Sequence, residues 1–452
     1  MMASPCTAPN TQLRPLSAQR SAAGELLLGG CRAEDLAAAH GTPLLVLDEQ
    51  TLREACRAYT TALAAHYPPG GRVLYASKAL ALQAIHALVH QEGLGLDVVS
   101  AGELHTALTA GVPAAACVLQ GNNKTREELR SALQGQVGRI NVDNLDELQT
   151  LIALAHETDC TTRVLLRVAP GIEAHTHEFI RTGQEDSKFG LDLKSGQLDT
   201  ALEWLKGQTH VAWLGLQAHI GSQIFDAQAF DTTAEVMVGL LVEIRERHGL
   251  TATELDLGGG LGIVYTDADG PPAIAAVVER LCRAVLDACA RADYPPPRLV
   301  LEPGRSIVGS AGVTLYRVGA RKEVPGIRTY VAVDGGMGDN PRPITYGARY
   351  TAEPAGTARP GGERVTIAGR YCESGDILLS DVDLPPLVAG DLLAVYGTGA
   401  YTYAMASQYN RVGRPAVLLV SDGRADLIAA RESLDDLVRL DRLPARLRGT
   451  SA

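Results

Sequence analysis

The sequence lacks two features that would each place it in a different class of protein. No run of apolar residues approaches the roughly 20 that a membrane-spanning helix needs, so a membrane span is not expected. Positive charge is in deficit: the formal net charge is −11, which argues against binding a polyanion such as nucleic acid through bulk electrostatics. A local anion site remains compatible with that charge.

The sequence also lacks paired cysteine motifs, and its first 22 residues contain no acidic residue. The eight cysteines include no Cys-x-x-Cys pair and no close pairing with histidine. This spacing suggests neither a zinc ribbon nor a disulfide framework, so no metal is expected and a cytoplasmic, reducing setting is the simplest. Residues 1–22 contain Arg14 and Arg20 but no acid, and they are rich in Ala, Ser and Pro. We predict a disordered tail there, with a transit peptide as the alternative.

What is present is a regular alternation of β-rich and helical segments. Eight strands with intervening helices indicate a TIM-like (β/α)8 barrel, and an open doubly wound sheet is the runner-up. The predicted strands are Val73 to Ser77, Leu94 to Val99, Ala116 to Gln120, Gly138 to Val142, Thr162 to Val168, Trp213 to His219, Glu254 to Leu257 and Arg298 to Leu301.

The first helices of this pattern have recognisable starts. A helical run extends from Ala79 to His90. Ser100, Thr125 and Asn144 each precede a glutamate by three residues. The first two predict reciprocal capping boxes, and the third predicts an asparagine N-cap.

The length of 452 residues suits a barrel of about 250 residues plus a second unit. We predict that residues 23–48 join a β domain, that residues 49–309 form the barrel, and that residues 310–452 form a C-terminal all-β domain of sandwich or barrel type. The strand Thr42 to Leu47 is expected to complete that domain. No helix is expected in it before Ser433 to Leu440. Its predicted strands include Val313 to Val318, Thr329 to Val333, Glu363 to Ile367, Leu392 to Tyr396 and Ala416 to Val420.

Polar residues gather where the barrel strands end, which is where barrel enzymes keep their chemistry. Lys78 closes the first strand, although most lysines are solvated surface charges. Two Gly-rich loops follow the sixth and seventh strands, at His219 to Gln223 and Gly258 to Gly262, and Glu302 to Ser306 follows the eighth. Such loops suit a phosphate because glycine lets backbone N–H groups approach an anion closely. Taken alone, the glycine run is also compatible with a simple tight turn.

A phosphate site, a lysine amine and an acid on one rim together indicate pyridoxal 5′-phosphate as the cofactor. Lys78 would form the Schiff base, and Glu302 would protonate the pyridine nitrogen. His219 would lie against the face of the ring. A lone histidine is more often a satisfied core group, but the position of His219 at a strand end beside a Gly-Ser pair favours a functional role.

A series of motifs occurs in order between about Gly24 and Arg446. They are Tyr75-Ala76-Ser77-Lys78-Ala79, Asp97 to Leu104, Gly121-Asn122-Asn123-Lys124, His175-Thr176-His177, Lys188-Phe189-Gly190, His219 to Gln223, Asp256 to Gly262, Glu302 to Ser306, Asp334 to Met337, Asn340 to Pro343, Cys372-Glu373-Ser374, Gly399-Ala400-Tyr401 and Tyr409-Asn410. On these motifs the chain resembles the diaminopimelate decarboxylases, in the alanine-racemase-like barrel group of pyridoxal phosphate enzymes.

The resemblance implies a role for each matching residue. Lys78, His219 and Glu302 are similar to the Schiff-base lysine, the ring-stacking histidine and the pyridine partner. Cys372 resembles a proton donor that a partner subunit supplies, which implies a homodimer with shared active sites. Further cofactor contacts are implied at Ser222, Gly260, Pro303, Gly304, Arg305 and Tyr401, and substrate contacts at Arg305, Arg342, Tyr346, Glu373 and Tyr401.

The implied reaction is decarboxylation of meso-2,6-diaminopimelate at its D-centre to L-lysine and carbon dioxide, the last step of lysine biosynthesis. The far end of this substrate carries a carboxylate and an ammonium, so it requires a cationic anchor such as Arg342 and an anionic one such as Glu373.

Three alternatives stay open. The first is a sister decarboxylase for ornithine, lysine, arginine or a carrier-bound amino acid, against which Arg305, Arg342 and Tyr346 argue, since they suit a second carboxylate. The second is a barrel racemase. The third is an inactive relative that binds a partner or stores cofactor; it would be expected to lack Lys78 or Cys372, and both are present.

Overall fold

The computed structural model describes residues 8–171 and 187–447. The chain divides into two compact units. The barrel unit comprises the residues up to 18, residues 48–313 and residues 396–404, and the sheet unit comprises residues 19–47, 314–395 and those from 405 onward. Within the described ranges, no helix is both long and apolar enough to cross a membrane.

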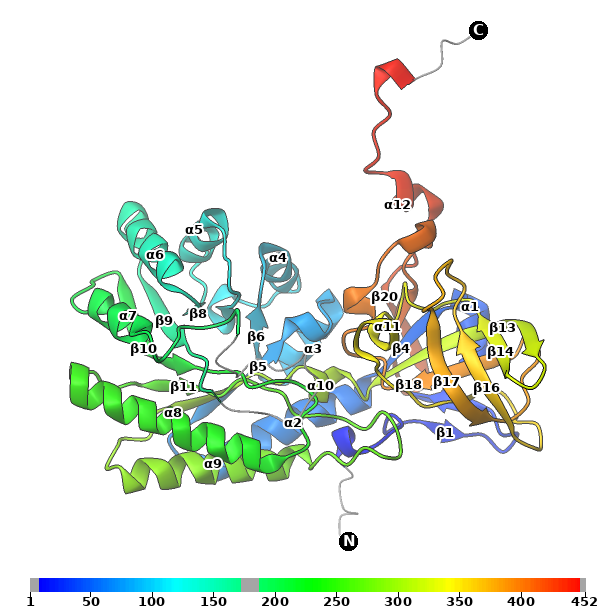
Figure 1. The fold of residues 1–452 in the computed structure, drawn as a ribbon, viewed down its shortest axis with the longest axis horizontal. Helices are drawn as coiled ribbons and strands as arrows, with labels where there is room; N and C mark the ends of the chain where they lie inside the picture. Colours follow the sequence, from blue (N-terminus) through cyan, green and yellow to red (C-terminus); the bar gives the residue numbers. More distant parts are fainter. Residues whose placement is uncertain (1–7, 172–186, 448–452) are drawn as a thin grey trace. The chain divides into compact units, whose positions relative to one another are not determined.

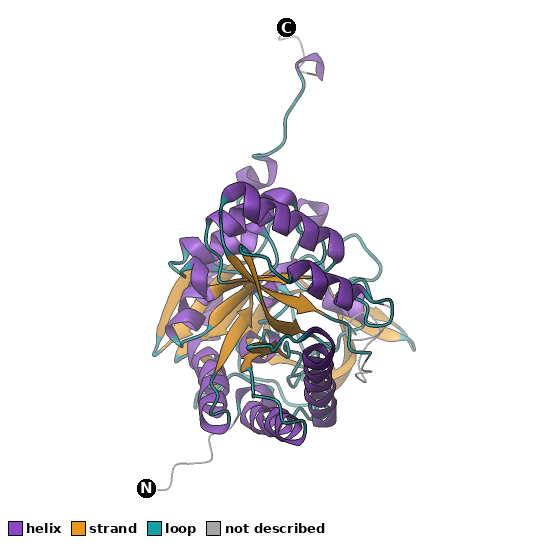
Figure 2. Ribbon diagram, turned by 90° about the vertical axis from the view of Figure 1, so that its left-hand side faces the viewer, coloured by secondary structure: helices purple, strands orange, loops and turns teal. Residues whose placement is uncertain are grey.

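Eight parallel strands close into a barrel in the order β10-β11-β12-β5-β6-β7-β8-β9. In Figure 2 they lie at the centre of a ring of helices. The predicted barrel is therefore confirmed. Its strands are β5 (Gly71–Ala76), β6 (Gly95–Val98), β7 (Cys117–Leu119), β8 (Arg139–Val142), β9 (Thr162–Arg167), β10 (Val211–Gln217), β11 (Glu254–Asp256) and β12 (Arg298–Leu301).

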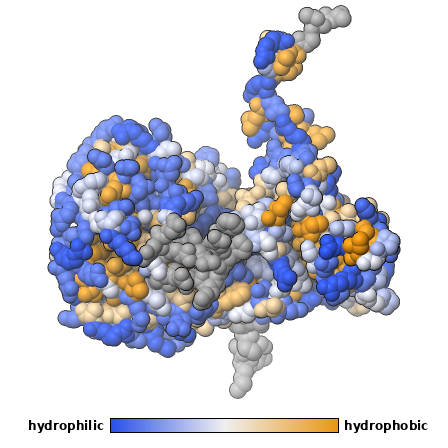
Figure 3. Space-filling view, viewed as in Figure 1, coloured by the Kyte–Doolittle hydropathy of each residue, from blue (hydrophilic) through white to orange (hydrophobic). Residues whose placement is uncertain are grey.

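Amphipathic helices cover the barrel because each buries one apolar face against the strands. Their solvent-facing sides are mostly hydrophilic in Figure 3. Inside the barrel, Leu74, Val118 and Val300 from three strands pack into one apolar cluster. The helices are α2 (Glu49–His66), α3 (Gln83–Gln91), α4 (Ala101–Thr109), α5 (Arg126–Gln134), α6 (Leu145–Thr158), α7 (Gln197–Leu205), α8 (Ala227–His248), α9 (Ile274–Arg291) and the short α10 (Arg305–Val308), with 3-10 turns η1 (Pro9–Thr11), η2 (Ser77–Ala79) and η3 (Ala114–Ala116).

The helix starts were predicted well except in two places. The reciprocal capping box at Thr125 and the N-cap at Asn144 are confirmed. Ser100 accepts from the Glu103 N–H, but the Glu103 carboxylate accepts from the Val99 N–H instead of returning to Ser100, so this box is one-sided.

The helix predicted from Ala79 begins only at Gln83. The Ala79 carbonyl accepts from the Tyr401 N–H (2.9 Å), and the Leu80 carbonyl accepts from the Tyr75 hydroxyl (3.1 Å). Because a distant backbone N–H occupies the Ala79 carbonyl and a side chain of β5 occupies the Leu80 carbonyl, neither joins a helical ladder.

The predicted disordered tail is wrong from residue 8 onward. Asn10 is fully buried: its Nδ2 donates to the Pro272 carbonyl (2.8 Å), and its Oδ1 accepts from the Ile274 N–H (3.2 Å) at the start of α9. In the sheet unit, Arg20 pairs with Glu353 at 2.9 Å. Polar side chains thus anchor a segment whose Ala, Ser and Pro content predicted disorder.

A buried ion pair connects the loop after β7 with helix α6. Lys124 Nζ donates to the Gly121 and Asn141 carbonyls, both at 2.7 Å, and to Glu147 Oε1 of α6 at 2.8 Å. The two side chains are only 1% and 3% exposed. Burial lowers the pKa of Lys124 and raises that of Glu147, while each charge favours the ionised form of the other.

Replacing Lys124 by Met should therefore lower the free energy of unfolding by about 3–5 kcal/mol, because it leaves Glu147 buried without a counter-charge. Chemical denaturation of both proteins measures the difference. Lys206→Met is the matched control, since Lys206 and Glu203 form an ion pair of similar length (2.6 Å) at the surface. Equal stabilities of the Lys124 and Lys206 variants would contradict the expectation.

The sheet unit is built on a nine-stranded sheet whose main order is β17-β16-β14-β13-β4-β19-β20, with β18 paired to β13 and β15. The N-terminal strand β4 lies between β13 and β19, so its predicted pairing with distant segments is confirmed. The strands are β4 (Leu44–Asp48), β13 (Gly312–Val324), β14 (Arg328–Val333), β15 (Ala352–Pro354), β16 (Glu363–Ala368), β17 (Ile377–Leu384), β18 (Leu392–Tyr396), β19 (Ala416–Ser421) and β20 (Arg424–Ala429), with a separate small sheet of β1 (Gln19–Arg20), β2 (Leu26–Leu28) and β3 (Cys31–Arg32).

Short helices accompany this sheet, as labelled in Figure 1. The helix α11 interrupts a stretch for which we predicted none, because Pro341 and Pro343 suit a helical first turn. The C-terminal helix is present but shorter than predicted, and Ser433 caps it. The helices are α1 (Ala33–His40), α11 (Arg342–Tyr346) and α12 (Leu434–Val438), with 3-10 turns η5 (Tyr403–Met405), η6 (Tyr409–Arg411) and η7 (Ala445–Leu447).

Candidate active site

Lys78 lies in η2, directly after β5, with an exposed side chain. Its neighbours Ser77 and Ala79 are buried, and the Ala79 carbonyl accepts from the Tyr401 N–H. The lysine therefore stands on a fixed backbone at the carboxyl end of a barrel strand.

Glu302 follows β12 and is only 6% exposed. Its Oε1 accepts from Gln120 Nε2 at 2.5 Å, and its Oε2 accepts from Gln217 Nε2 at 3.0 Å. Two amide donors, one to each oxygen, stabilise the ionised carboxylate where water does not.

Two further carboxyl groups, Asp97 of β6 and Asp256 of β11, are buried close to Glu302. Burial, followed by the charge of Glu302, raises the pKa of both side chains well above the ordinary value for aspartate. These three carboxyl groups thus lie close together in the barrel, where ionisation of one disfavours ionisation of the others.

His219 follows β10, and its Nδ1 accepts from the Gly259 N–H at 3.3 Å. Although the residue as a whole is half-buried, desolvation is the largest cause lowering the pKa of His219 well below its ordinary value. The positive charges of Lys78 and Arg167 lower it further. At neutral pH the ring is therefore an uncharged imidazole, which suits packing against an aromatic ring rather than forming an ion pair.

The backbone of the Gly-rich loops passes so close to neighbouring atoms that residues larger than glycine do not fit well at Gly260 and Gly304. Gly260 has φ +114°, and a Cβ there would lie 2.4 Å from the Gly221 carbonyl oxygen. A Cβ on Gly304 would lie 3.1 Å from that of Ala76. The Pro303 carbonyl accepts from the Ala76 N–H at 3.0 Å, so the loop after β12 is fixed to the end of β5.

Arg305 brings the remaining predicted cofactor residues together. Its guanidinium donates to Ser222 Oγ at 2.9 and 3.3 Å and to the Tyr265 hydroxyl at 2.6 Å. It also lies 4.8 Å from the centre of the Tyr401 ring. This side chain is 6% exposed, so a cation is held in place beside two glycine loops.

The sheet unit carries the other predicted site residues. Arg342 begins α11, is buried, and donates to the Tyr350 hydroxyl at 2.7 Å; Tyr346 ends the same helix, half-buried. Cys372 and Glu373 are both exposed, and the Cys372 N–H donates to Asn410 Oδ1 at 2.8 Å.

Reasoning from the sequence assigned no role to Gln120, Gln217 or Tyr265, and it matched Asp97 and Asp256 only as parts of motifs. Their signal was polar character inside predicted buried strands, since four of the five lie in or directly after strands. His175 and His177, which belong to a matched motif, lie outside the described residues.

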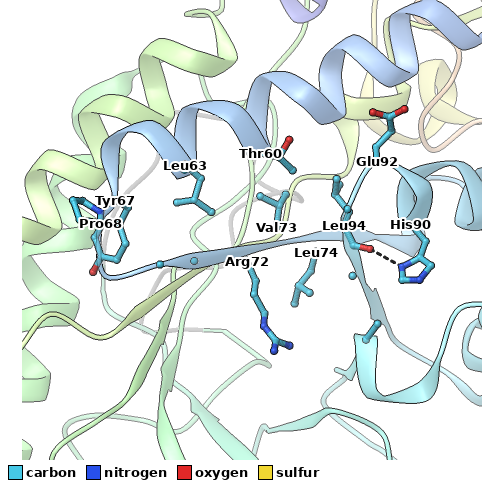
Figure 4. A pocket seen from close by; sticks show the side chains of 16 residues that line it. Thr60, Leu63, Tyr67, Pro68, Arg72, Val73, Leu74, His90, Glu92 and Leu94 are labelled. Atoms are coloured by element: carbon cyan, nitrogen blue, oxygen red, sulfur yellow. Dashed lines mark hydrogen bonds between the residues drawn. The ribbon is translucent and has the colours of Figure 1, made fainter.

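A cavity lies at the other end of the barrel strands (Figure 4). There Thr60 and Leu63 of α2 face Val73, whereas Arg72 and Leu74 point to the opposite side of β5. Its lining comes from the starts of β5 and β6. Because barrel enzymes place their chemistry at the carboxyl ends of the strands, this cavity is not the candidate active site.

The residues at the carboxyl ends fit pyridoxal phosphate. An amine is available at Lys78 for its aldehyde, a buried carboxylate at Glu302 for its ring nitrogen, and glycine loops with Arg305 and Ser222 for its phosphate. Buried polar atoms here have no hydrogen-bond partner among the described residues, including Ser77 Oγ and the Oε1 atoms of Gln120 and Gln217. A polar group bound in the barrel mouth could satisfy such atoms.

Comparisons with known proteins agree with this chemistry. Residues 49–309 match the model of the pyridoxal-dependent decarboxylase, pyridoxal binding domain. The diaminopimelate decarboxylases of Synechocystis and Bacillus subtilis are 48% and 49% identical to the chain, over 97% and 92% of it and 95% of each relative. The crystal structure of diaminopimelate decarboxylase from M. jannaschii with L-lysine superposes with a TM-score of 0.89 at 34% identity, covering 98% of this chain and all of the other.

A barrel with this constellation, matched over its length by that family model, defines a pyridoxal phosphate-dependent decarboxylase. Its cofactor is pyridoxal 5′-phosphate, and it is a carbon-carbon lyase. Within that class, the chain belongs to the diaminopimelate decarboxylase family. The expected family, fold class, cofactor and enzyme class are thereby confirmed, while the roles of individual residues stay predictions.

Proposed function

We propose that this protein decarboxylates meso-2,6-diaminopimelate at its D-centre and releases L-lysine and carbon dioxide. The observation that carries the proposal is the gathering of Lys78, Glu302 and the Arg305–Ser222 pair at one end of the barrel, in a chain nearly half identical to diaminopimelate decarboxylases. The enzyme would work in the cytoplasm, at the end of lysine biosynthesis.

When bound, pyridoxal phosphate supplies an electron sink for the pair of electrons that the departing carboxyl group leaves on the α-carbon. Lys78 would hold the cofactor covalently and yield its place to the substrate amine. Glu302, fixed by Gln120 and Gln217, would keep a negative charge at the ring nitrogen. The uncharged His219 ring would pack against the cofactor face and exclude water.

The phosphate would be held by backbone N–H groups of the glycine loops, with Ser222, Gly260, Gly304 and Tyr401. Arg305 would orient this cradle through Ser222 and also attract a substrate carboxylate. Arg305 can serve both roles because its charge is buried and rigidly held, which strengthens its interaction with any anion nearby.

The far end of the substrate would be recognised by four of the predicted substrate-binding residues. The Arg342 guanidinium would pair with the distal carboxylate, and Glu373 would pair with the distal ammonium. Tyr346 and Tyr401 would add hydroxyl groups. A substrate without the second carboxylate would leave Arg342 buried without its anion, which would disfavour lysine and ornithine.

We further propose a homodimer in which Cys372 of one subunit delivers the proton to the α-carbon held by the other. The surroundings of Cys372 support a covered surface: Ile344 and Tyr409 are large apolar side chains exposed on the same unit, and the Tyr409 hydroxyl donates to the Cys372 carbonyl at 3.4 Å. Exposed apolar groups around a polar centre are typical of subunit interfaces.

Cys372→Ala should lower kcat by about 10²- to 10⁴-fold, the usual contribution of a positioned acid, with a smaller change in KM. The rate of carbon dioxide release by the purified variant measures it. Cys160→Ala is a suitable control, since Cys160 lies after α6 on the barrel unit. Full activity of Cys372→Ala would remove the cysteine from the mechanism.

The proposed reaction is tested by supplying protein and pyridoxal phosphate with meso-diaminopimelate, and in parallel with lysine, ornithine and arginine. Lysine and carbon dioxide from the first substrate alone is the expected result. Faster release from one of the others would instead identify a sister decarboxylase. Change of stereochemistry without carbon dioxide would identify a racemase.

A further inference from the structure

The buried Asp256 has one oxygen whose hydrogen bonding requires a proton. Its Oδ1 accepts from the Gly258 N–H at 2.8 Å. Its Oδ2 meets no donor among the described residues. Its carboxyl group lies close to Glu302, whose backbone N–H donates to the Gly258 carbonyl at 2.7 Å and whose charge acts on Asp256. Two carboxyl groups can share a hydrogen bond only if one of them keeps its proton.

The surroundings decide which carboxyl group is protonated. Glu302 accepts from two side-chain amides, at 2.5 and 3.0 Å, whereas Asp256 accepts from one backbone N–H. The negative charge is therefore better stabilised on Glu302. Asp256 is 1% exposed, so water offers its ionised form no alternative stabilisation.

The other charged groups around this pair favour the same arrangement. Asp97 of β6 is a second carboxyl group close to Asp256, after Glu302. A negative charge on Asp256 would repel the charges of Glu302 and Asp97. The positive charges of Lys78 and Arg167 act on Asp97 and on His219, whereas the leading charge effects on Asp256 come from Glu302 and Asp97. The leading charge effects on Asp256 thus come from carboxyl groups, and they disfavour its ionised form.

We propose that Asp256 is a positioning residue that retains its proton and donates a hydrogen bond to Glu302, so that Glu302 alone carries the charge of the pair. This rests on the proposed role of Glu302 at the ring nitrogen of the cofactor. Asp256 would fix the orientation of the Glu302 carboxylate from the side of β11, while Gln120 and Gln217 hold it from β7 and β10. Glu302 would then carry a full charge in one defined position.

Asparagine is a close mimic of a protonated aspartate, which makes the proposal testable. In Asp256→Asn, Oδ1 can still accept from the Gly258 N–H, and Nδ2 replaces the protonated oxygen as donor to Glu302. Asp256→Leu has the same branched shape and no donor. Asp287→Asn, at an exposed position on α9, controls for the loss of a carboxyl group as such.

The first measurement is thermal unfolding of the full-length chain between pH 5 and pH 8. A buried aspartate that keeps its proton has a raised pKa, so the wild type loses stability as pH rises above the unfolded-state pKa. Asp256→Asn cannot titrate, so its Tm advantage over the wild type should grow towards pH 8, and Asp287→Asn should show no such trend. A difference that does not grow with pH, or an Asn variant that does not fold, overturns the proposal.

The second measurement is the pH titration of the absorbance of bound cofactor. Asp256→Asn should titrate with the wild-type midpoint, whereas Asp256→Leu should shift the midpoint and weaken cofactor binding by about 10- to 100-fold, the effect of losing a hydrogen bond to a charge. If Asn shifts the midpoint as Leu does, Asp256 is ionised and the proposal fails. Both readouts remain valid if the protein acts on a different amino acid, so failure here is distinguishable from failure of the proposed function.

Discussion

Lys78→Ala is expected to lose decarboxylation by a factor on the order of 10⁴ or more, because the covalent attachment and exchange of the cofactor depend on one amine. Among the residues that the structure describes, no other lysine lies at the end of β5: Lys124 is fixed in a buried ion pair with Glu147. Lys188, the next lysine along the chain, lies beyond β9 on the ring of Phe189. The side chain at position 78 is thus the one placed at the end of β5.

The test measures both the rate of decarboxylation and the identity of the lysine that binds the cofactor. Protein incubated with pyridoxal phosphate is reduced with borohydride, digested, and searched by mass spectrometry for a cofactor-modified lysine, while carbon dioxide release gives the rate. Lys206→Ala, at the C-cap of α7, should behave as the wild type in both assays. Modification of another lysine in the wild type, or reducible cofactor retained by Lys78→Ala, would show that the assignment is wrong.

Glu302→Gln should be the second most damaging substitution, with kcat lowered by about 10²- to 10³-fold, the cost of removing one preorganised electrostatic partner. The variant keeps the shape but loses the charge. Its amide nitrogen would also face the amide donor of Gln120 or Gln217, where the carboxylate now accepts from both. The effect should fall mainly on kcat, since charge develops on the cofactor during bond cleavage and not on binding.

Steady-state kinetics with saturating cofactor separates the two constants. The matched control is Glu279→Gln, which neutralises an exposed carboxylate on α9 that pairs with Arg283. An unchanged kcat in Glu302→Gln, with bound cofactor verified by absorbance, would exclude the carboxylate from the electrostatic role proposed for it.

Much of the barrel was predictable because its signals are local. Each strand is a short buried run, and Thr125 and Asn144 each cap the following helix through an atom three residues away. Such patterns depend on neighbours in sequence. The places of Lys78 and Glu302 followed directly, since residues just after parallel strands meet at one rim.

Other features were not predictable because their causes lie far along the chain. The helix after Lys78 starts late because Tyr401, more than 300 residues away, binds the Ala79 carbonyl. Residues 8–18 are ordered because Asn10 fits against the start of α9. In both cases local composition suggested one structure, and a distant hydrogen-bond partner favoured another.

The sequence by itself determined the class of fold, the family, the cofactor, and which side chains stand at the ends of the strands. Only the tertiary structure decided how the Glu302 charge is held, because Gln120, Gln217 and Asp256 become its neighbours through closure of the barrel. Protonation and hydrogen bonding depend on burial and on partners a few ångströms away in space. Spacing along the chain carries no record of those distances until the strands have closed.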